Sequence, residues 1–294
     1  MYTVKYTIFT PTFNRAYCLE NLYKSLLNQT FKDFEWVVVD DGSTDGTLKM
    51  LNKFQKQGKL NCTIISQKNS GKHIAINRGI MVTKGMFFMI VDSDDKLPVN
   101  SLEIINKKVD TILANHQIAG VVGRKAYFNG KKVGTTDFFQ DKISNTLDIR
   151  FKDHLKGDLA EVFKSDILKE YPFPFFENER FCPEALVWNR ITEKYKMLYF
   201  DDIVYSCEYL NDGLTAKIIQ LRKESPKASM LYYSELEKYN IPFLQKLKAN
   251  VNFWRFSFNS AESFWVLLKR VSFINSIIGL PFGFLMYVND GRKL

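Results

Sequence analysis

The sequence predicts an α/β fold: a mostly parallel, Rossmann-like sheet flanked by helices, with a helical, aromatic-rich extension at the C-terminus. Three observations support this prediction. β-rich and helical stretches alternate over about the first 115 residues, most β-rich stretches there end in a polar cluster, and dense aromatic and aliphatic segments begin at about residue 252. Strict alternation at this spacing is typical of right-handed βαβ units, which build parallel sheets.

The predicted elements follow from apolar periodicity and from turn-forming residues at their ends. Strands are expected at residues 5–10, 34–40, 62–66, 86–91, 158–164 and 197–205, and a strand with a hairpin at 120–134, turning at Asn129 and Gly130. Helices are expected at residues 18–27, 46–57, 73–83, 98–115, 184–191 and 225–248.

The most informative stretch is MFFMIVDSDD at residues 86–95, an apolar run followed at once by Asp92, Ser93, Asp94 and Asp95. An uninterrupted apolar run predicts a strand buried on both faces, and ligands of open α/β sheets bind beyond the carboxyl ends of such strands. Clustered carboxylates repel one another unless a hard divalent cation lies between them. The alternative is that Asp94 or Asp95 begins the helix that follows Pro98.

Two other strand ends point to the same crevice. Phe13 follows the first predicted strand and Asp41 follows the second. An aromatic face suits the stacking of a pyrimidine base, and a carboxylate accepts from its N–H group. With a carboxylate-bound metal, these features describe a pocket for a nucleoside diphosphate. Neither GxGxxG nor GxxxxGK[ST] occurs, which argues against a dinucleotide site and a P-loop.

Composition narrows the partner and the compartment. The formal charge of +9 over 294 residues indicates an anionic partner, such as a phosphorylated substrate, an anionic lipid or a nucleic acid. The four cysteines are scattered without a CxxC pair, which is typical of reduced thiols in a cytoplasmic protein. The N-terminus enters a strand almost at once, so we expect no signal peptide.

Four ordered motifs carry a resemblance to a known family: PTFNR at 11–15, VVVDDGSTDGT at 37–47, NSGKHIAINRG at 69–79 and VDSDD at 91–95. Over about the first 115 residues they resemble the nucleotide-binding half of the inverting family 2 glycosyltransferases, which have the GT-A fold. The resemblance implies a UDP-sugar donor. The nucleotide-binding residues that it implies are Pro11, Thr12, Phe13, Asn14, Asp41, Lys72, Asn77, Asp92 and Ser93.

Within that set, the resemblance places residues 11–13 around the uracil, Asp41 on the base, and Lys72 and Asn77 near the nucleoside or phosphates. It also implies that Asp94, in a DXD-type motif, is the ligand of Mn²⁺ or Mg²⁺. Many relatives carry Arg where this chain has Ile76, and Lys72 or Arg78 is the expected substitute. A helix-surface amide at Asn77 and a solvated lysine at Lys72 are the alternatives.

Inverting transfer needs one base, which takes the proton from the acceptor hydroxyl as the oxygen attacks the anomeric carbon. Glu184 follows Pro183 at the start of an amphipathic helix, where relatives place an acidic base, and Ala185 removes the neighbouring candidate. The alternative for Glu184 is a glutamate that complements the helix dipole. Glu179 is the fallback base.

Other polar residues of the second half are weaker candidates. Asp158 and Glu161 are either acceptor contacts or surface residues. Residues 212–215 resemble a family loop near the diphosphate, and Arg222 is read either as a diphosphate contact or as an exposed basic residue.

The C-terminal segment alternates apolar and aromatic runs with basic residues such as Lys246, Lys248, Lys269 and Arg270. Its longest uncharged run, residues 271–289, contains Pro281 and is at the lower edge of membrane-spanning length. We expect in-plane amphipathic helices on the inner face of the plasma membrane, held by apolar burial and by anionic lipid. Packing onto the catalytic domain and a homodimer interface are the alternatives.

The predicted organisation is a nucleotide-sugar-binding half at 1–115, an acceptor-binding and catalytic half at 116–224 and a membrane-associating extension at 225–294. The predicted activity is a metal-dependent glycosyl transfer of the hexosyltransferase type, from a UDP-sugar to a lipid-linked saccharide acceptor. The predicted process is the synthesis of a bacterial surface polysaccharide. Two alternatives are a sugar-nucleotide pyrophosphorylase, which would want a glycine-rich loop after the first strand, and a basic nucleic-acid-binding protein, for which no motif is present.

Overall fold

The computed structural model describes residues 2–210 and 213–291. The chain forms two compact units. The first, called here the sheet unit, comprises Met1–Pro172 and Trp188–Tyr209. The second, the helical unit, comprises Phe173–Val187 and Leu210–Leu294. This division into two bodies does not test the predicted functional boundaries at residues 115 and 224, which stay predictions.

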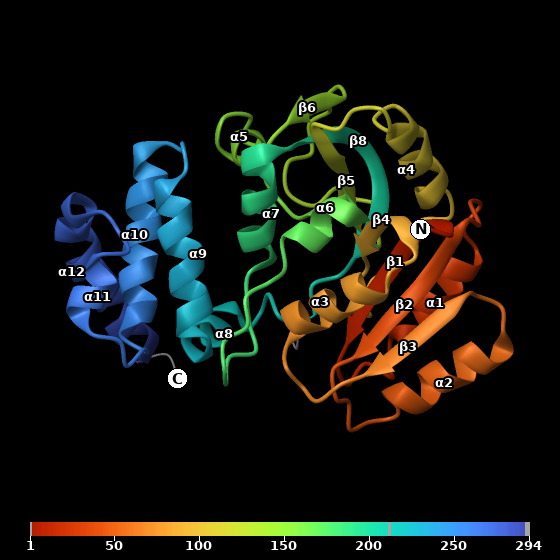
Figure 1. The fold of residues 1–294 in the computed structure, drawn as a ribbon, viewed down its shortest axis with the longest axis horizontal. Helices are drawn as coiled ribbons and strands as arrows, with labels where there is room; N and C mark the ends of the chain where they lie inside the picture. The colour runs from red at the N-terminus through yellow and green to blue at the C-terminus, as the bar shows by residue number, and fades with distance from the viewer. Residues whose placement is uncertain (1, 211–212, 292–294) are drawn as a thin grey trace. The chain divides into compact units, whose positions relative to one another are not determined.

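The elements that supply the sheet unit alternate as the sequence predicts (Figure 1). In chain order they are β1 (Val4–Thr12), α1 (Leu19–Leu27), β2 (Phe34–Asp40), α2 (Thr47–Gln57), β3 (Cys62–Ser66), α3 (Lys72–Val82), β4 (Gly85–Ile90), α4 (Ser101–Asp110), β5 (Ile118–Tyr127), β6 (Lys142–Ser144), α5 (Thr146–Phe151), β7 (Leu159–Lys164), α6 (Ser165–Glu170), α7 (Glu184–Lys194) and β8 (Lys196–Cys207).

These strands form one sheet in the order β3-β2-β1-β4-β7-β5-β8-β6. β3, β2, β1 and β4 run parallel, whereas β7 lies antiparallel between β4 and β5. β5 pairs with β8 in parallel, and β6 adds an antiparallel edge. The mixed α/β sheet flanked by helices confirms the predicted fold class. Because β1, β2 and β4 are parallel neighbours, their carboxyl ends meet at one edge, as the sequence argument requires.

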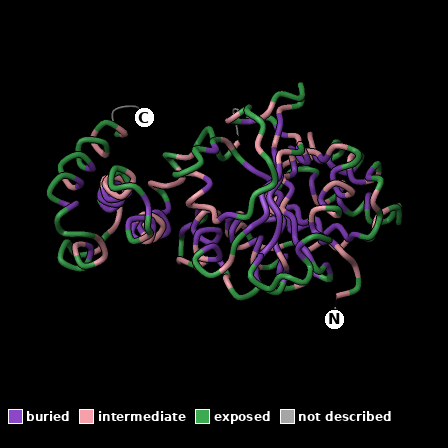
Figure 2. The backbone as a smooth tube through the Cα atoms, turned by 90° about the horizontal axis from the view of Figure 1, so that it is seen from above, coloured by how far each residue is buried: buried purple, intermediate pink, exposed green. Residues whose placement is uncertain are grey.

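The core lies between this sheet and its helices, and most residues of the central strands are buried (Figure 2). Every residue of β2 is buried, including Trp36. Gly79 brings α3 close to the sheet, because a Cβ at that position would lie 2.2 Å from the ring of Phe9. This close approach holds the N-terminal end of α3, which starts at Lys72, in a fixed place at the edge of the sheet.

The described part of the helical unit contains the start of α7 and the helices α8 (Ile218–Glu224), α9 (Pro226–Lys238), α10 (Phe243–Ser257), α11 (Phe264–Leu268) and α12 (Phe273–Gly291). The prediction of one helix over residues 225–248 is wrong, since α9 ends at Lys238 and α10 begins after Pro242. Proline lacks a backbone N–H and disfavours helical backbone before it, so it separates the two helices.

A small apolar cluster and a buried polar network hold these helices together. Trp254 and Leu267 belong to the apolar cluster. The Glu237 carboxylate accepts from the Asn250 Nδ2 at 3.0 Å and from the Asn275 Nδ2 at 2.6 Å, which ties α9 to α10 and α12. Among the residues that the structure describes, no helix has the length and apolar character to cross a membrane.

Candidate active site

The loops after β1 and β2 are joined by hydrogen bonds. The Asp41 backbone N–H donates to the Thr12 carbonyl at 2.8 Å. Asn14, whose φ of 53° is left-handed, donates its backbone N–H to the Ser43 Oγ and accepts from the Thr44 N–H through its Oδ1, both at 2.8 Å. Asn14 therefore fixes the shape of this crevice, and asparagine tolerates the left-handed backbone that the turn requires.

Phe13 presents an aromatic face at this edge. Phe13 is 44% exposed, whereas Pro11 and Thr12, the last two residues of β1, are buried. An exposed ring at the carboxyl end of a central strand is available to stack on a flat ligand.

The Asp41 carboxylate is buried and fixed in position by three donors. Its Oδ1 accepts from the Gln67 Nε2 at 2.7 Å and from the Ser70 N–H at 2.8 Å, and its Oδ2 accepts from the Gly71 N–H at 2.8 Å. An ionised carboxylate has about four acceptor positions, so roughly one remains for a ligand N–H. The same hydrogen bonds hold the loop that leads into Lys72, the first residue of α3.

Acidic and basic side chains alternate beyond β4. The Lys72 Nζ lies 2.6 Å from the Asp92 Oδ1, and an Arg15 guanidinium nitrogen lies 4.0 Å from the Asp94 Oδ2. The Tyr205 hydroxyl donates to the Asp95 Oδ2 at 2.7 Å and accepts from the Asp92 backbone N–H at 3.0 Å. Lys72, predicted either as a phosphate contact or as a solvated lysine, is thus paired within the cluster.

The protonation of the three carboxyl groups follows from this arrangement. Burial, and then the charge of Asp92, raise the pKa of Asp94, and the same two causes raise the pKa of Asp95 to about 7. Burial alone would also raise the pKa of Asp92, but Lys72 and the neighbouring cations outweigh it and the pKa falls below its usual value. A cation bound beside Asp94 would favour its ionised form.

Lys125 of β5 is a further member of the cluster. Its Nζ lies 4.0 Å from the ring centroid of Tyr205. Burial alone would lower the pKa of Lys125, but Asp92 and Asp95 outweigh it, followed by Glu161 and Asp158, and the pKa rises. Asp158 and Glu161 were predicted either as acceptor contacts or as surface residues. Their charges act on Lys125 and therefore contribute to the electrostatics of the carboxylate cluster beyond β4.

The sequence analysis missed three of these residues. Arg15 lies inside the PTFNR run, so its motif could have pointed to it. Lys125 and Tyr205 carry no such signal, because each is one residue of a long strand whose register brings it to the cluster. Strand register depends on pairing with distant segments and is not legible in a local pattern.

These residues fit a cation that is held jointly with a ligand. No group of three or more metal-ligating side chains comes together within residues 2–210 and 213–291. Mg²⁺ and similar ions are commonly bound by one or two carboxylates together with substrate phosphates. Asp94, with its raised pKa and its place beside Asp92, offers one such carboxylate.

The remaining predicted residues have clear positions. Ser93 is buried between the two aspartates, and Asn77 is half-buried on α3. Position 76 is a fully buried isoleucine, and Arg78 is exposed. Lys72 pairs with Asp92, and the replacement of the family arginine by Lys72 or Arg78 stays a prediction.

The two acidic candidates of the helical unit have different environments. Glu184 is the first residue of α7, as predicted. Glu179 accepts the backbone N–H groups of Lys227 at 2.8 Å and Ala228 at 2.9 Å, so it caps the N-terminus of α9. Both of its oxygens are used by this cap, which makes the fallback base a structural residue. Asp212 of the predicted diphosphate loop lies outside the described residues.

Arg222 is not an exposed basic residue. Its guanidinium carbon lies 5.1 to 5.6 Å from the ring centroids of Phe181, Tyr232 and Tyr233, all in the helical unit. Cation–π contacts of this kind stabilise packing between α8 and α9. The reading of Arg222 as an exposed residue is therefore wrong, whereas its reading as a diphosphate contact stays a prediction.

The mixed sheet flanked by helices has the architecture of the GT-A glycosyltransferases. The chain belongs to glycosyl transferase family 2, whose sequence profile matches residues 7–164. This membership confirms the resemblance that the four motifs suggested, and it decides against the pyrophosphorylase and nucleic-acid-binding alternatives.

Two curated relatives agree with the family. GalNAc(5)-diNAcBac-PP-undecaprenol beta-1,3-glucosyltransferase of Campylobacter jejuni is 31% identical over 196 residues, which cover 63% of this chain and 58% of that protein. Glycosyltransferase GlyG of Streptococcus pneumoniae is 25% identical over 209 residues, covering 68% of this chain and 69% of the relative. The chain thus matches little more than half the length of the Campylobacter protein.

Solved structures agree with the fold. TarS 1-349 of S. aureus in complex with UDP-GlcNAc superposes with a TM-score of 0.68 at 18% identity, covering 98% of this chain and 89% of the other. The mannosyltransferase PcManGT from Pyrobaculum calidifontis, in complex with GDP-Man and Mn²⁺, gives a TM-score of 0.58 at 18% identity, with coverages of 99% and 76%. At these identities the likeness is one of fold.

Proposed function

We propose that this protein is a metal-dependent, inverting glycosyltransferase that moves one sugar from a UDP-sugar to a saccharide acceptor. The observation that carries the proposal is the meeting of Phe13, Asp41 and Asp94 with basic side chains at one edge of the sheet. An aromatic ring, a base acceptor and a cation-binding carboxylate are the three requirements of a pyrimidine nucleoside diphosphate.

In this proposal the uracil stacks on Phe13, and its N–H donates to the remaining acceptor position of Asp41. The phosphates lie toward Asp94, Lys72, Arg15 and Lys125. Mn²⁺ or Mg²⁺, bound by Asp94 and the diphosphate, would stabilise the negative charge of the leaving group. The paired cations offset the charges of Asp92 and Asp95, so the site accepts an anion without strong net repulsion.

Glu184 is the proposed base. It removes the proton from the acceptor hydroxyl as that oxygen forms its bond to the anomeric carbon and the bond to UDP breaks. The other acidic candidate on this stretch, Glu179, is used as a helix cap. The donor-site residues belong to the sheet unit, and Glu184 belongs to the helical unit.

The names of similar proteins support the choice of substrates. The Campylobacter relative is named for a PP-undecaprenol-linked glycan and a glucosyl transfer, and the TarS structure contains UDP-GlcNAc. PcManGT contains Mn²⁺. We therefore propose a lipid-linked saccharide of bacterial surface-polysaccharide synthesis as the acceptor.

A membrane surface is the proposed location. α11 and α12 expose large apolar side chains, among them Trp265 at 70% and Ile274 at 74%. Lys269 and Arg270 lie between these two helices. Exposed aromatic and aliphatic residues with basic neighbours suit in-plane insertion at an anionic lipid surface.

The test of the chemistry compares three proteins in UDP-release assays with a panel of UDP-sugars, Mn²⁺ and a lipid-linked acceptor. We expect Glu184→Gln to lower turnover by about 10²–10⁴-fold, the usual contribution of a general base, while UDP affinity stays unchanged. Glu193→Gln, on the same helix, is the matched control and should retain turnover. Retained turnover in Glu184→Gln would contradict the assignment of the base.

A further inference from the structure

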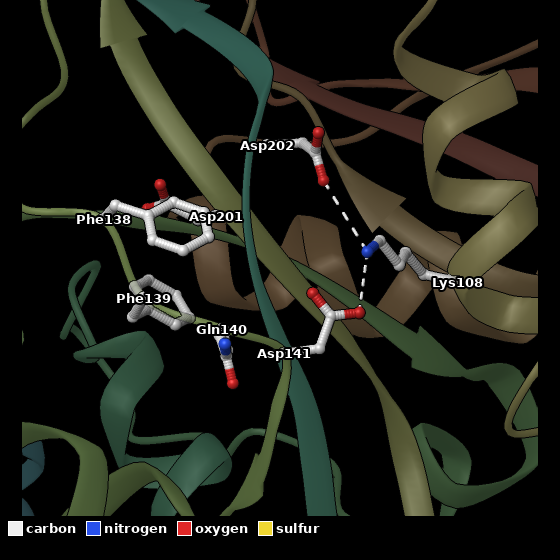
Figure 3. A pocket seen from close by; sticks show the side chains of 7 residues that line it. All are labelled: Lys108, Phe138, Phe139, Gln140, Asp141, Asp201 and Asp202. Atoms are coloured by element: carbon white, nitrogen blue, oxygen red, sulfur yellow. Dashed lines mark hydrogen bonds and ion pairs between the residues drawn. The ribbon is translucent and has the colours of Figure 1, made fainter.

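A second polar pocket lies away from the donor carboxylates, within the sheet unit (Figure 3). Its volume is about 390 Å³, and it is lined by Lys108, Phe138, Phe139, Gln140, Asp141, Asp201 and Asp202. It shares none of these residues with the nucleotide-binding candidates. Cavities of roughly 300–1,000 Å³ are the usual size of small-ligand sites.

An irregularity in β8 forms one wall of the pocket. Val122 of β5 lies opposite Tyr199, and Arg124 lies opposite Ile203. Two steps along β5 therefore match four along β8, which inserts two extra residues into β8. Asp201 and Asp202 lie in this bulge, and bulges of this kind redirect side chains near functional sites.

Asp201 of the pocket wall forms a buried ion pair with Arg124 behind it, and this pair has few hydrogen bonds. Arg124 is fully buried, its Nε lies 3.6 Å from the Asp201 Oδ1, and none of its three nitrogens has a hydrogen-bond partner in the described part of the chain. The Asp201 Oδ1 also accepts no hydrogen bond there, although the side chain is only 8% exposed. Buried polar atoms of this kind are normally satisfied, so the Arg124–Asp201 pair beside the pocket is an unusual feature of this strand pair.

The charges around the pocket balance. Lys108 pairs with Asp141 at 2.6 Å and with Asp202 at 3.8 Å. Lys132 and Arg124 pair with Asp201. Each of the three lining carboxylates, Asp141, Asp201 and Asp202, is paired with a cation, so none of them offers an unpaired charge to an ion. Within the described residues, the carboxylates do not group into a metal site either. A neutral ligand rich in hydroxyl groups fits this chemistry best.

The aromatic residues of the pocket restrict the class of ligand further. Phe138 is 75% exposed at the mouth, and Phe139 stands beside it with its ring centroid 5.6 Å from the Arg124 guanidinium carbon (Figure 3). A phenylalanine face attracts the weakly positive C–H hydrogens on the apolar face of a pyranose, while carboxylates accept from its hydroxyls. An exposed ring beside fixed carboxylates therefore matches a sugar.

We propose that this pocket is a second saccharide-binding site, which holds a neutral sugar residue of the acceptor or of the growing product away from the donor edge. The inference rests on the proposed function, because that function supplies saccharides as substrate and product. Occupancy by an acceptor chain would keep the polymer on the enzyme between transfers, and its effect would be on acceptor affinity rather than on donor binding.

The test measures saccharide binding to the full chain by saturation-transfer NMR, in the presence of saturating UDP and Mn²⁺. The probes are cellobiose, lactose, N,N′-diacetylchitobiose and the charged analogue cellobiouronic acid. We expect saturable binding of at least one neutral disaccharide and weaker binding of the acid. Phe138→Ala should weaken the binding about tenfold, the usual worth of one aromatic contact, and Asp202→Ala should weaken it as well.

Phe175→Ala removes a ring that is equally exposed, at 70%, but lies in the helical unit, and it should leave the binding unchanged. Absence of saturable binding by every probe, or binding that the two pocket variants do not alter, would overturn the inference. UDP affinity measured in the same samples reports separately on the donor site. If no saccharide binds the pocket while UDP still binds, the further inference is wrong and the proposed function is unaffected.

Discussion

The N-terminal strands and the last two helices use similar apolar residues in opposite ways. In β1, β2 and β4, phenylalanine, valine and isoleucine are buried, and the polar groups that follow them gather at one edge. In α11 and α12 most of the large apolar residues are exposed, among them Trp265, Phe273 and Ile277. A small apolar cluster around Trp254 and the buried polar network of Glu237 hold these helices to the unit.

This difference separates two tasks. Burial of the strands fixes Phe13, Asp41 and Asp94 in position, and a preorganised site is what transition-state stabilisation requires. Exposed apolar area is tolerated where another surface covers it. We therefore expect changes at the sheet edge to alter chemistry with little effect on attachment, and changes on α11 and α12 to do the reverse.

Among the tests of this comparison, Asp94→Asn has the largest expected effect. The change removes the cation-binding charge, and we expect metal-dependent turnover to fall by about 10²–10³-fold. The fold should survive, because Asp92 and burial already disfavour the charge of Asp94. Vesicle binding should be unchanged. Asp33→Asn, at an exposed position outside the cluster, is the control, and equal losses in both variants would break the comparison.

The next effect concerns the helical unit. Trp265→Glu with Ile277→Glu should lower co-sedimentation with anionic vesicles by at least about tenfold, since burial of each side chain contributes roughly 1.5–3 kcal/mol. Donor affinity should not change. Met81→Glu, on a residue of the sheet unit that is 78% exposed, is the matched control. If the wild-type chain does not sediment with vesicles but forms dimers, and the double variant is monomeric, the exposed face is a homodimer interface.

The smallest expected effect is a pH dependence confined to the sheet unit. Burial lowers the pKa of His73 to about 4 from an ordinary 6.5. The folded state disfavours the charged imidazole, so the stabilisation is complete above pH 6.5 and is lost as the pH falls toward 4. The loss is at most about 3 kcal/mol. Urea titrations should show a shallower pH dependence in His73→Gln than in wild type, while the exposed His116→Gln should follow wild type.

Much of the fold could be predicted because its signals are local. The predicted bounds of β2 and β3 agree with the structure, and the other N-terminal elements differ by a few residues. The antiparallel insertion of β7 between β4 and β5 could not be predicted, because strand order is set by contacts between distant segments. The break between α9 and α10 had a visible cause in Pro242, which the sequence analysis did not use.

The donor edge was more predictable than the rest of the site. Phe13, Asp41, Asp92 and Asp94 directly follow strands, so parallel topology alone brings them together. Lys125 and Tyr205 join them only through the register of β5 and β8. The roles of Glu179 as a cap and of Arg222 among aromatic rings depend on tertiary packing of the helical unit, which no local pattern encodes.

The most direct test of the central claim is a calorimetric titration of the full chain with UDP, and with GDP for contrast, first with Mn²⁺ and then with EDTA. The account predicts UDP binding that requires the metal, weak binding of GDP, and loss of metal dependence in Asp94→Asn. If neither UDP nor GDP binds, with Mn²⁺ or with EDTA, the result would contradict the claim that Phe13, Asp41 and Asp94 form a nucleotide-sugar site.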